Sequence, residues 1–179
     1  MEITVSVGLK MIVSVIGSSS SLPHHTELAI ELGIELAKHV RVDYVVCGGM
    51  GGIMQAVCEG VQIGIKEGFE CKTIGILPGN DKSLGNDHID IPIVTGMGFA
   101  RNIVVALSGD VVIAVGGAYG TLSELGHSLS EGRPVIALDS WDLDITGEGE
   151  KVSDKSTFES VSNVKDVIAK LDSIIIGLK

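Results

Sequence analysis

Short apolar runs alternate with segments of helical period along this chain. Runs rich in Val, Ile and Leu predict strands at residues 11–16, 43–47, 73–77, 91–95, 111–115 and 134–138. These runs are almost continuously apolar rather than alternating, which is typical of strands that are covered on both faces. The pattern therefore predicts a parallel sheet with helices on both sides.

Segments of helical period fill most of the gaps between these strands. They predict helices at about residues 25–39, 51–67, 97–108, 120–131 and 158–171. In the first of them Leu28, Leu32 and Leu36 recur every four residues, and charged residues occupy positions between them, as in a helix that lies on a sheet. The alternation predicts the α/β class, as a single-domain, doubly wound, Rossmann-like parallel sheet.

The length of 179 residues fits one domain, and we expect residues 1–179 to form a single Rossmann-like nucleotide-binding domain. Residues 1–10 alternate like an edge strand and could be an extra strand or part of the first one. Residues 139–157 are acidic and polar, which predicts an exposed connection before the last helix.

Composition limits the classes of partner. The formal net charge of −10 opposes binding to nucleic acid or anionic membranes, and one Trp, two Tyr and three Phe offer little for base stacking. Without a long apolar run or a leader-like start, the expected location is cytoplasmic. Cys47, Cys58 and Cys71 form no Cys-x-x-Cys pair, and we expect buried free thiols.

Glycine-rich turns follow the first, second and fifth predicted strands. In a parallel sheet these turns meet at one edge, where backbone N–H groups and helix N-termini favour anions. The turns predict an anion or nucleotide site, the alternative being turns that need Gly only for packing. The candidate ligand-binding residues there are Gly17, Ser18, Ser19, Gly48, Gly49, Gly51, Gly52, Gly116, Gly117, Ala118, Tyr119, Gly120 and Thr121.

Several familiar motifs are incomplete. Met54 stands where the dinucleotide fingerprint needs its third Gly, no Lys-Ser or Lys-Thr follows the Gly117 turn, and no Gly-x-Ser-x-Gly elbow surrounds Ser18. A nicotinamide oxidoreductase, an ATPase and a serine hydrolase are therefore disfavoured. His127 and Glu124 would supply at most half of a metal site, so no metal is predicted, and His24 and His25 are interpreted as exposed polar residues.

Two charged residues fall beside these turns. Arg101 follows the fourth predicted strand on the first turn of a helix, where it could clamp a phosphate or form only a surface ion pair. Glu124 is placed on the first turn of the next helix, where it could bind ribose hydroxyls, stabilise charge at an anomeric carbon, or only contact the helix dipole. Met97 and Asn102 lie near Arg101 and are further candidate ligand-binding residues.

Residues 116–124, Gly-Gly-Ala-Tyr-Gly-Thr-Leu-Ser-Glu, resemble the Pro-Gly-Gly-x-Gly-Thr-x-x-Glu motif of the LOG family, long mislabelled as lysine decarboxylases. The likeness extends over about residues 11–138. LOG enzymes hydrolyse nucleoside 5′-monophosphates to a free base and ribose 5-phosphate. The resemblance implies that Glu124 and Arg101 are catalytic residues and that residues 117–121 hold the phosphate.

Residues 95–102 are also similar to a sister branch that includes molybdenum-cofactor carrier proteins, which bind a phosphorylated pterin. Two functions therefore stay open: a module that binds a phosphorylated nucleotide or molybdopterin-type ligand, and a nucleoside 5′-monophosphate phosphoribohydrolase. Neither needs a separate cofactor. The resemblance further implies a homo-oligomer, either a dimer or a tetramer.

Overall fold

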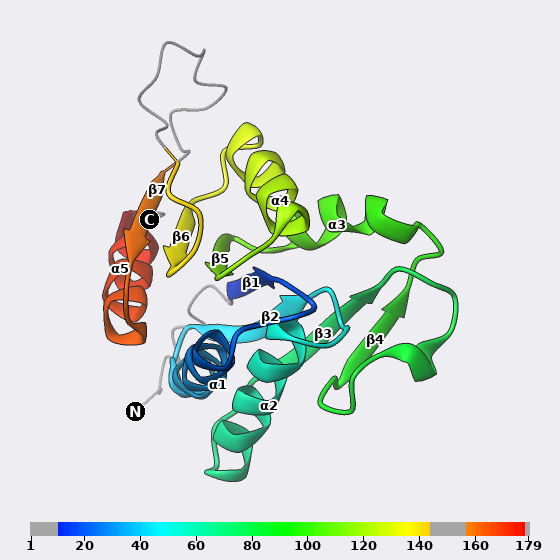
Figure 1. The fold of residues 1–179 in the computed structure, drawn as a ribbon. Helices are drawn as coiled ribbons and strands as arrows, with labels where there is room; N and C mark the ends of the chain where they lie inside the picture. Colours follow the sequence, from blue (N-terminus) through cyan, green and yellow to red (C-terminus); the bar gives the residue numbers. More distant parts are fainter. Residues whose placement is uncertain (1–10, 144–156, 178–179) are drawn as a thin grey trace, which may run out of the picture.

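The computed structural model describes residues 11–143 and 157–177. Its strands form one parallel sheet in the order β4-β3-β2-β1-β5-β6-β7, which confirms the predicted fold class (Figure 1). The strands are β1 (Met11–Gly17), β2 (Val42–Cys47), β3 (Lys72–Leu77), β4 (Ile91–Val94), β5 (Val111–Val115), β6 (Val135–Leu138) and β7 (Phe158–Val161).

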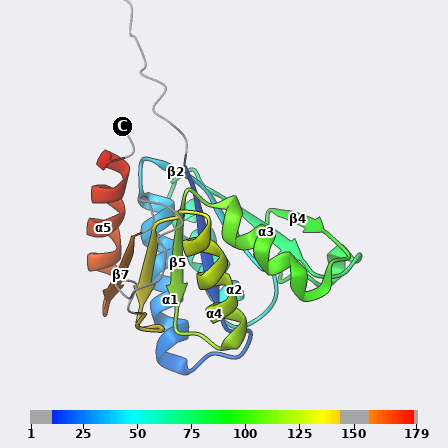
Figure 2. The same ribbon diagram turned by 90° about the horizontal axis from the view of Figure 1, so that it is seen from above.

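Helices cover both faces of the sheet, as Figures 1 and 2 show from two directions. The α-helices are α1 (Pro23–Lys38), α2 (Ile53–Lys66), α3 (Arg101–Ser108), α4 (Tyr119–Ser130) and α5 (Val164–Gly177), and the short 3₁₀ turns are η1 (Lys82–Leu84) and η2 (Gly98–Ala100). One face carries α1, α2 and α5, and the other carries α3 and α4. Within residues 11–143 and 157–177, no helix has the length and apolar character needed to cross a membrane.

The central strands explain why the apolar runs in the sequence are continuous. In β5, Val111, Ile113 and Val115 face the cluster under α1, α2 and α5, whereas Val112 and Ala114 face the cluster under α3 and α4. All five side chains are fully buried. The three cysteines are buried free thiols, as the sequence predicted: Cys47, Cys58 and Cys71.

Helices α1 and α2 approach each other closely because each presents a glycine at the contact. A Cβ atom added to Gly33 would lie 2.9 Å from the backbone nitrogen of Val61 and 3.0 Å from the Cα of Gly60. A Cβ atom on Gly60 would meet the backbone of Ile30. Backbone-to-backbone packing fixes α1 against α2, and with it the loops that precede both helices.

The order of the strands reverses at the centre of the sheet. The chain proceeds outward from β1 through β2 and β3 to β4, then returns to the other side of β1 as β5. Connections that leave β1 and β5 therefore run to opposite faces of the sheet, which opens a crevice beyond the carboxyl ends of these strands.

The predicted helix at 158–171 is wrong at its start. Residues Phe158–Val161 instead form β7, in which Phe158 pairs with Val135 and Ser160 with Ala137 of β6. The helix begins after Asn163, whose side-chain oxygen accepts a hydrogen bond of 2.9 Å from the backbone N–H of Asp166. A four-residue edge strand with two polar positions is too short for its period to stand out from the helix that follows.

Only the beginning and the last residue of the predicted exposed connection at 139–157 lie within the described residues. Asp139 and Asp142 are exposed, but Trp141 and Leu143 are half-buried and pack against the cluster under α3 and α4. Their apolar surface holds the beginning of this segment on the domain. Residues 144–156, and the possible extra strand at 1–10, lie outside the described residues.

Candidate functional site

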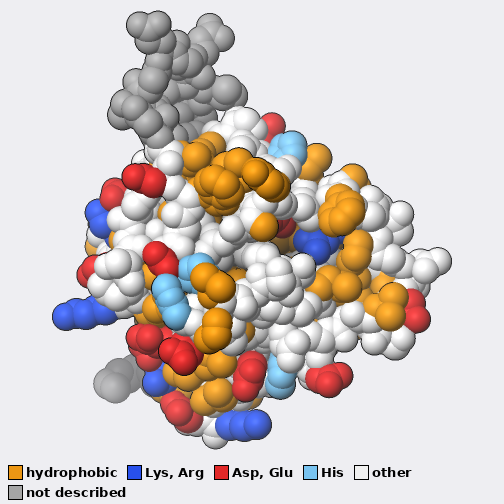
Figure 3. All heavy atoms as spheres, viewed as in Figure 1, with side chains coloured by type: hydrophobic (Ala, Val, Ile, Leu, Met, Phe, Trp, Pro, Cys, Tyr) orange, Lys and Arg blue, Asp and Glu red, His pale blue; other side chains and the backbone are white. Residues whose placement is uncertain are grey.

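A pocket of about 540 Å³ opens at the carboxyl edge of the sheet, at the central crevice. Its walls are the turns after β1 and β2, the segment that leads into α3, and the first turns of α4. Figure 3 shows a hollow on this face in which Lys or Arg atoms are visible, with hydrophobic side chains around it. The pocket is therefore where the glycine-rich turns were expected to meet.

The structure brings most of the predicted site residues together around this pocket. Both charged candidates line it, along with residues from all three glycine-rich turns. The predicted residues on its wall are Gly17, Ser18, Ser19, Gly48, Arg101, Asn102, Ala118, Gly120, Thr121 and Glu124.

The remaining predicted residues do not line the pocket: Gly49, Gly51, Gly52, Met97, Gly116, Gly117 and Tyr119. Gly49, Gly52, Gly116 and Gly117 have positive φ angles and shape the turns behind the wall. Tyr119 projects outward, 82% exposed, and its ring lies 6.2 Å from that of Trp141. A glycine-rich turn thus supplies some residues that contact the pocket and others that only form the bend.

The apolar part of the wall was not predicted from the sequence. It consists of strand ends and side chains that carry no recognisable motif: Val15, Ile16, Met50, Met54, Pro78, Gly98 and Phe99. Phe99 contributes to this wall although 92% of its surface is exposed to solvent. An apolar wall with a few convergent polar groups is typical of a small-molecule site.

Arg101 is the first residue of α3 and is only 8% exposed, so it does not form a surface ion pair. Its guanidinium lies directly over Gly48, where an added Cβ atom would be 2.6 Å from Cζ. Its Nη1 is 3.6 Å from Oε1 of Glu124, and its Nη2 is 3.9 Å from Sδ of Met54. A separation of 3.6 Å is longer than a hydrogen bond. The buried guanidinium therefore faces the pocket with N–H donors that Glu124 does not occupy.

The sequence predicted Glu124 on the first turn of its helix, but the structure places it on the second turn of α4. The helix begins at Tyr119, so Gly120 and Thr121 belong to its first turn and Glu124 is its sixth residue. The carboxyl is 5% exposed. Burial raises the pKa of Glu124 to about 7, and the nearby positive charge of Arg101 opposes this rise. Burial also lowers the pKa of Arg101, which Glu124 opposes in turn.

The N-terminus of α4 adds uncharged donors to the same wall. Its N-cap residue is Ala118, which has no side-chain hydrogen bond to the first turn. Thr121 is 2% exposed, and its Oγ1 has no hydrogen-bond partner among the described residues. A buried hydroxyl without a partner is costly, and so is a bare helix start, unless a ligand or water satisfies them.

Comparison with known proteins identifies the relatives of this chain. The model of the SLOG cluster4 family matches residues 10–174. The molybdenum cofactor binding protein of the phototrophic bacterium Rippkaea orientalis has a similar structure, with a TM-score of 0.78 and 34% identity over 93% of this chain and 98% of its own. The molybdenum cofactor carrier protein of Chlamydomonas reinhardtii gives a TM-score of 0.77 and 29% identity over 93% and 99%.

A curated relative belongs to the hydrolase side of the superfamily. The cytokinin riboside 5′-monophosphate phosphoribohydrolase LOG7 of Arabidopsis thaliana is 33% identical over 111 residues, which are 60% of this chain and 48% of that protein. The resemblance drawn from the sequence motifs is confirmed. The chain belongs to the SLOG cluster4 family, within the LOG superfamily and on the side of its molybdenum-cofactor-carrier-like branch.

Proposed function

We propose that this chain binds a phosphorylated small molecule, either a pterin of the molybdenum-cofactor type or a nucleotide, in the pocket between α3 and α4. The observation that carries the proposal is the buried guanidinium of Arg101. It lies in a pocket of about 540 Å³, and its nearest carboxylate oxygen is 3.6 Å away. A phosphate oxygen could take the hydrogen bonds that Glu124 does not.

Two regions of the pocket suit two different parts of such a ligand. Arg101, the hydroxyl of Thr121 and the first N–H groups of α4 would hold the phosphate, as the LOG-like motif implies for residues 117–121. The apolar side chains of Met50, Met54 and Phe99 offer a wall for a flat heterocycle. The Rippkaea molybdenum cofactor binding protein and the Chlamydomonas molybdenum cofactor carrier protein support a pterin in this role.

Calorimetric titration tests the proposal with matched pairs of ligands. The pairs are a nucleoside 5′-monophosphate with its nucleoside, and a phosphorylated pterin with the same pterin lacking phosphate. We expect the phosphorylated member of at least one pair to bind more tightly by about tenfold or more, the worth of one charge-assisted hydrogen bond. Equal affinity within both pairs, or no binding of any of the four, would contradict the proposal.

A second candidate function is hydrolysis of nucleoside 5′-monophosphates, and the pKa of Glu124 favours it. A carboxyl with a pKa of about 7 exchanges protons readily near neutral pH, which suits a group that assists cleavage of an N-glycosidic bond. Bond cleavage by water would give a free base and ribose 5-phosphate. The Arabidopsis relative, named as a phosphoribohydrolase, supports this alternative from a distance.

A chromatographic assay for free base distinguishes the two candidate functions. Each nucleoside monophosphate is incubated with the protein and with the variant Glu124→Gln, and free base is measured. Base release by the wild type that disappears in the variant supports the hydrolase. Binding without base release leaves the protein as a binding module.

We also propose that the chain assembles into a dimer or a tetramer, which the family resemblance implies. Large apolar side chains are exposed around η2 and the start of α4: Phe99 is 92% exposed and Tyr119 82%. Light scattering during size-exclusion chromatography measures the mass in solution. A mass equal to the 18.6 kDa of one chain would contradict the proposal.

A further inference from the structure

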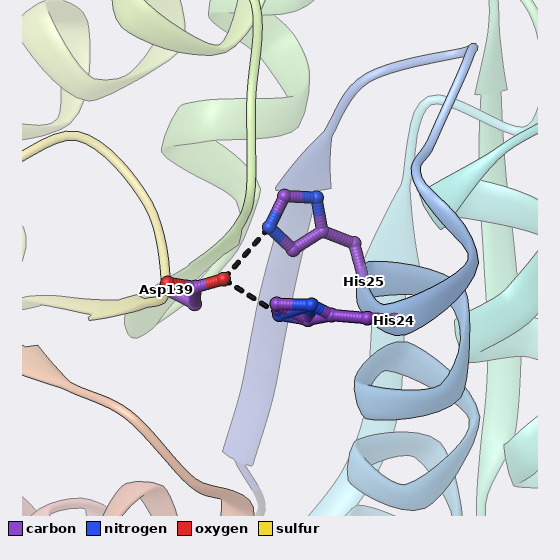
Figure 4. A group of neighbouring side chains, drawn as sticks. All are labelled: His24, His25 and Asp139. Carbon is purple, nitrogen blue, oxygen red and sulfur yellow. Dashed lines mark hydrogen bonds and ion pairs between the residues drawn. The ribbon is translucent and has the colours of Figure 1, made fainter.

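Two histidines and an aspartate meet beside the pocket, although the sequence separates them widely. Figure 4 shows the rings of His24 and His25 both directed at the carboxylate of Asp139. Nε2 of His24 is 2.7 Å, and Nε2 of His25 is 2.9 Å, from the same oxygen, Oδ2. The cluster therefore gathers three ligand atoms of the kinds that transition metals prefer.

Regular elements hold all three residues in place. The two histidines are on the first turn of α1, and Asp139 directly follows β6. Asp139 has a φ angle of 44°, the only positive value for a non-glycine among the described residues, and its backbone N–H donates to the carbonyl of Val161 at 2.9 Å. The left-handed backbone turns this side chain out of the line of β6 and toward α1.

Packing restricts the ring of His25 in particular. Only 17% of its side chain is exposed, and the ring lies against the backbone of Gly116, where an added Cβ atom would be 2.7 Å from Nδ1. His24 is more open, with 57% of its side chain exposed, as is Asp139 with 46%. Asp139 also lines a second hollow, of about 590 Å³, beside β7 and α5. The cluster thus combines one side chain held by packing, His25, with two that solvent can reach.

We propose that His24, His25 and Asp139 bind a divalent first-row transition-metal ion such as Zn²⁺ or Co²⁺. Metal–ligand bonds of about 2.0–2.2 Å in a tetrahedral site separate neighbouring ligand atoms by somewhat more than 3 Å. The observed separations of 2.7 and 2.9 Å would have to widen by roughly half an ångström or somewhat more to match it. On binding, each imidazole takes the tautomer with its proton on Nδ1, the Nε2 proton being exchanged through solvent, and Nε2 coordinates the ion through its lone pair.

The proposed ligand set excludes some ions and leaves coordination positions open. Two imidazoles and one carboxylate suit Zn²⁺, Co²⁺ or Ni²⁺, whereas Mg²⁺ prefers oxygen ligands alone. Three protein ligands leave at least one position for water or a small anion. The turn that carries Gly116 continues into Ala118 on the pocket wall, so the ion would lie next to the pocket without depending on what the pocket binds.

Titration of the untagged full chain with Zn²⁺ tests the proposal, and Co²⁺ absorption reports the ligand geometry. We expect one ion per chain, and an affinity that falls at least about tenfold in His25→Gln and in Asp139→Asn. His127→Gln, which removes a half-buried histidine outside the cluster, is the control and should bind as the wild type does. Excess Mg²⁺ should not displace Zn²⁺.

A second measurement separates loss of the site from loss of the fold. In the presence of a chelator, the ligand variants should melt within a few degrees of the wild type, and only the wild type and the control should gain melting temperature from Zn²⁺. The proposal is overturned if the wild type binds no Zn²⁺ at millimolar concentration. It is also overturned if His25→Gln and Asp139→Asn bind it with unchanged affinity, which would place the ion elsewhere, for example at a cysteine.

Discussion

At the scale of single residues, the site depends on a charged pair that is buried but not closely bonded. Glu124 and Arg101 approach to 3.6 Å with almost no exposure to solvent. Such a pair is costly to bury, and its attraction offsets the cost only with good geometry and further hydrogen bonds. The arrangement is better explained by a ligand that completes the hydrogen bonds of Arg101 than by a contribution to the stability of the fold.

The pKa of Glu124 predicts a pH dependence of stability. Between the ordinary value of 4.5 and about 7, the unfolded chain has lost this proton while the folded chain retains it. Stability therefore falls as the pH rises through this window, by about 1–3 kcal/mol. Urea unfolding at about pH 5 and pH 8 should show this loss in the wild type and not in Glu124→Gln, whereas parallel losses in both proteins would contradict it.

The position of Arg101 depends on the absence of a side chain at Gly48. In Gly48→Ala the new methyl would occupy the place of the guanidinium, which moves more easily than backbone. We expect binding of the phosphorylated ligand to weaken by about tenfold with little change in stability. Gly51→Ala is the control in the same turn, since its Cβ would make only an ordinary contact of 3.7 Å with the carbonyl of Ser19. If both variants bind equally well, Gly48 does not position Arg101.

At the scale of elements, the sequence located most strands and helices because their burial is so regular. Every position of β5 is buried, so its apolar run is unbroken. The edge strand β7 was missed since it has polar residues at Glu159 and Ser160 and only β6 beside it. Short edge strands owe their structure to the neighbour with which they pair, and that neighbour is not visible in their own sequence.

The contact between α1 and α2 predicts a strong effect of a small substitution. Gly60→Ala would place a methyl group against the carbonyl of Ile30, where neither helix can move without disturbing the core. We expect a loss of at least about 2 kcal/mol in the free energy of unfolding. Urea denaturation measures this loss as a lower midpoint at an unchanged slope.

Gly126→Ala provides the matched control for this prediction. Gly126 is an exposed position within α4, and an added Cβ atom would meet nothing within 4 Å. Alanine there should stabilise the protein by about 0.5–1 kcal/mol, because it favours the helix over the unfolded chain. Equal losses in the two variants would show that the close approach of α1 and α2 is not the cause.

At the scale of the whole molecule, the topology made the position of the pocket predictable. Parallel strands end at one edge, so residues as far apart in sequence as Gly17, Arg101 and Glu124 were expected to meet there, and they do. The apolar wall was not predicted, since Met54 and Phe99 carry no motif. The histidine–aspartate cluster was not predicted either, because 114 residues separate His25 from Asp139. Only the fold brings them together.

The central claim is that Arg101 binds the phosphate of a small molecule, and a comparison of dissociation constants tests it most directly. Each phosphorylated ligand and its dephosphorylated counterpart are titrated into the wild type and into Arg101→Ala. We predict that the substitution raises the dissociation constant of the phosphorylated ligand by about 10- to 100-fold and leaves that of its dephosphorylated counterpart nearly unchanged. Equal losses for both ligands, or no loss for either, would contradict the claim.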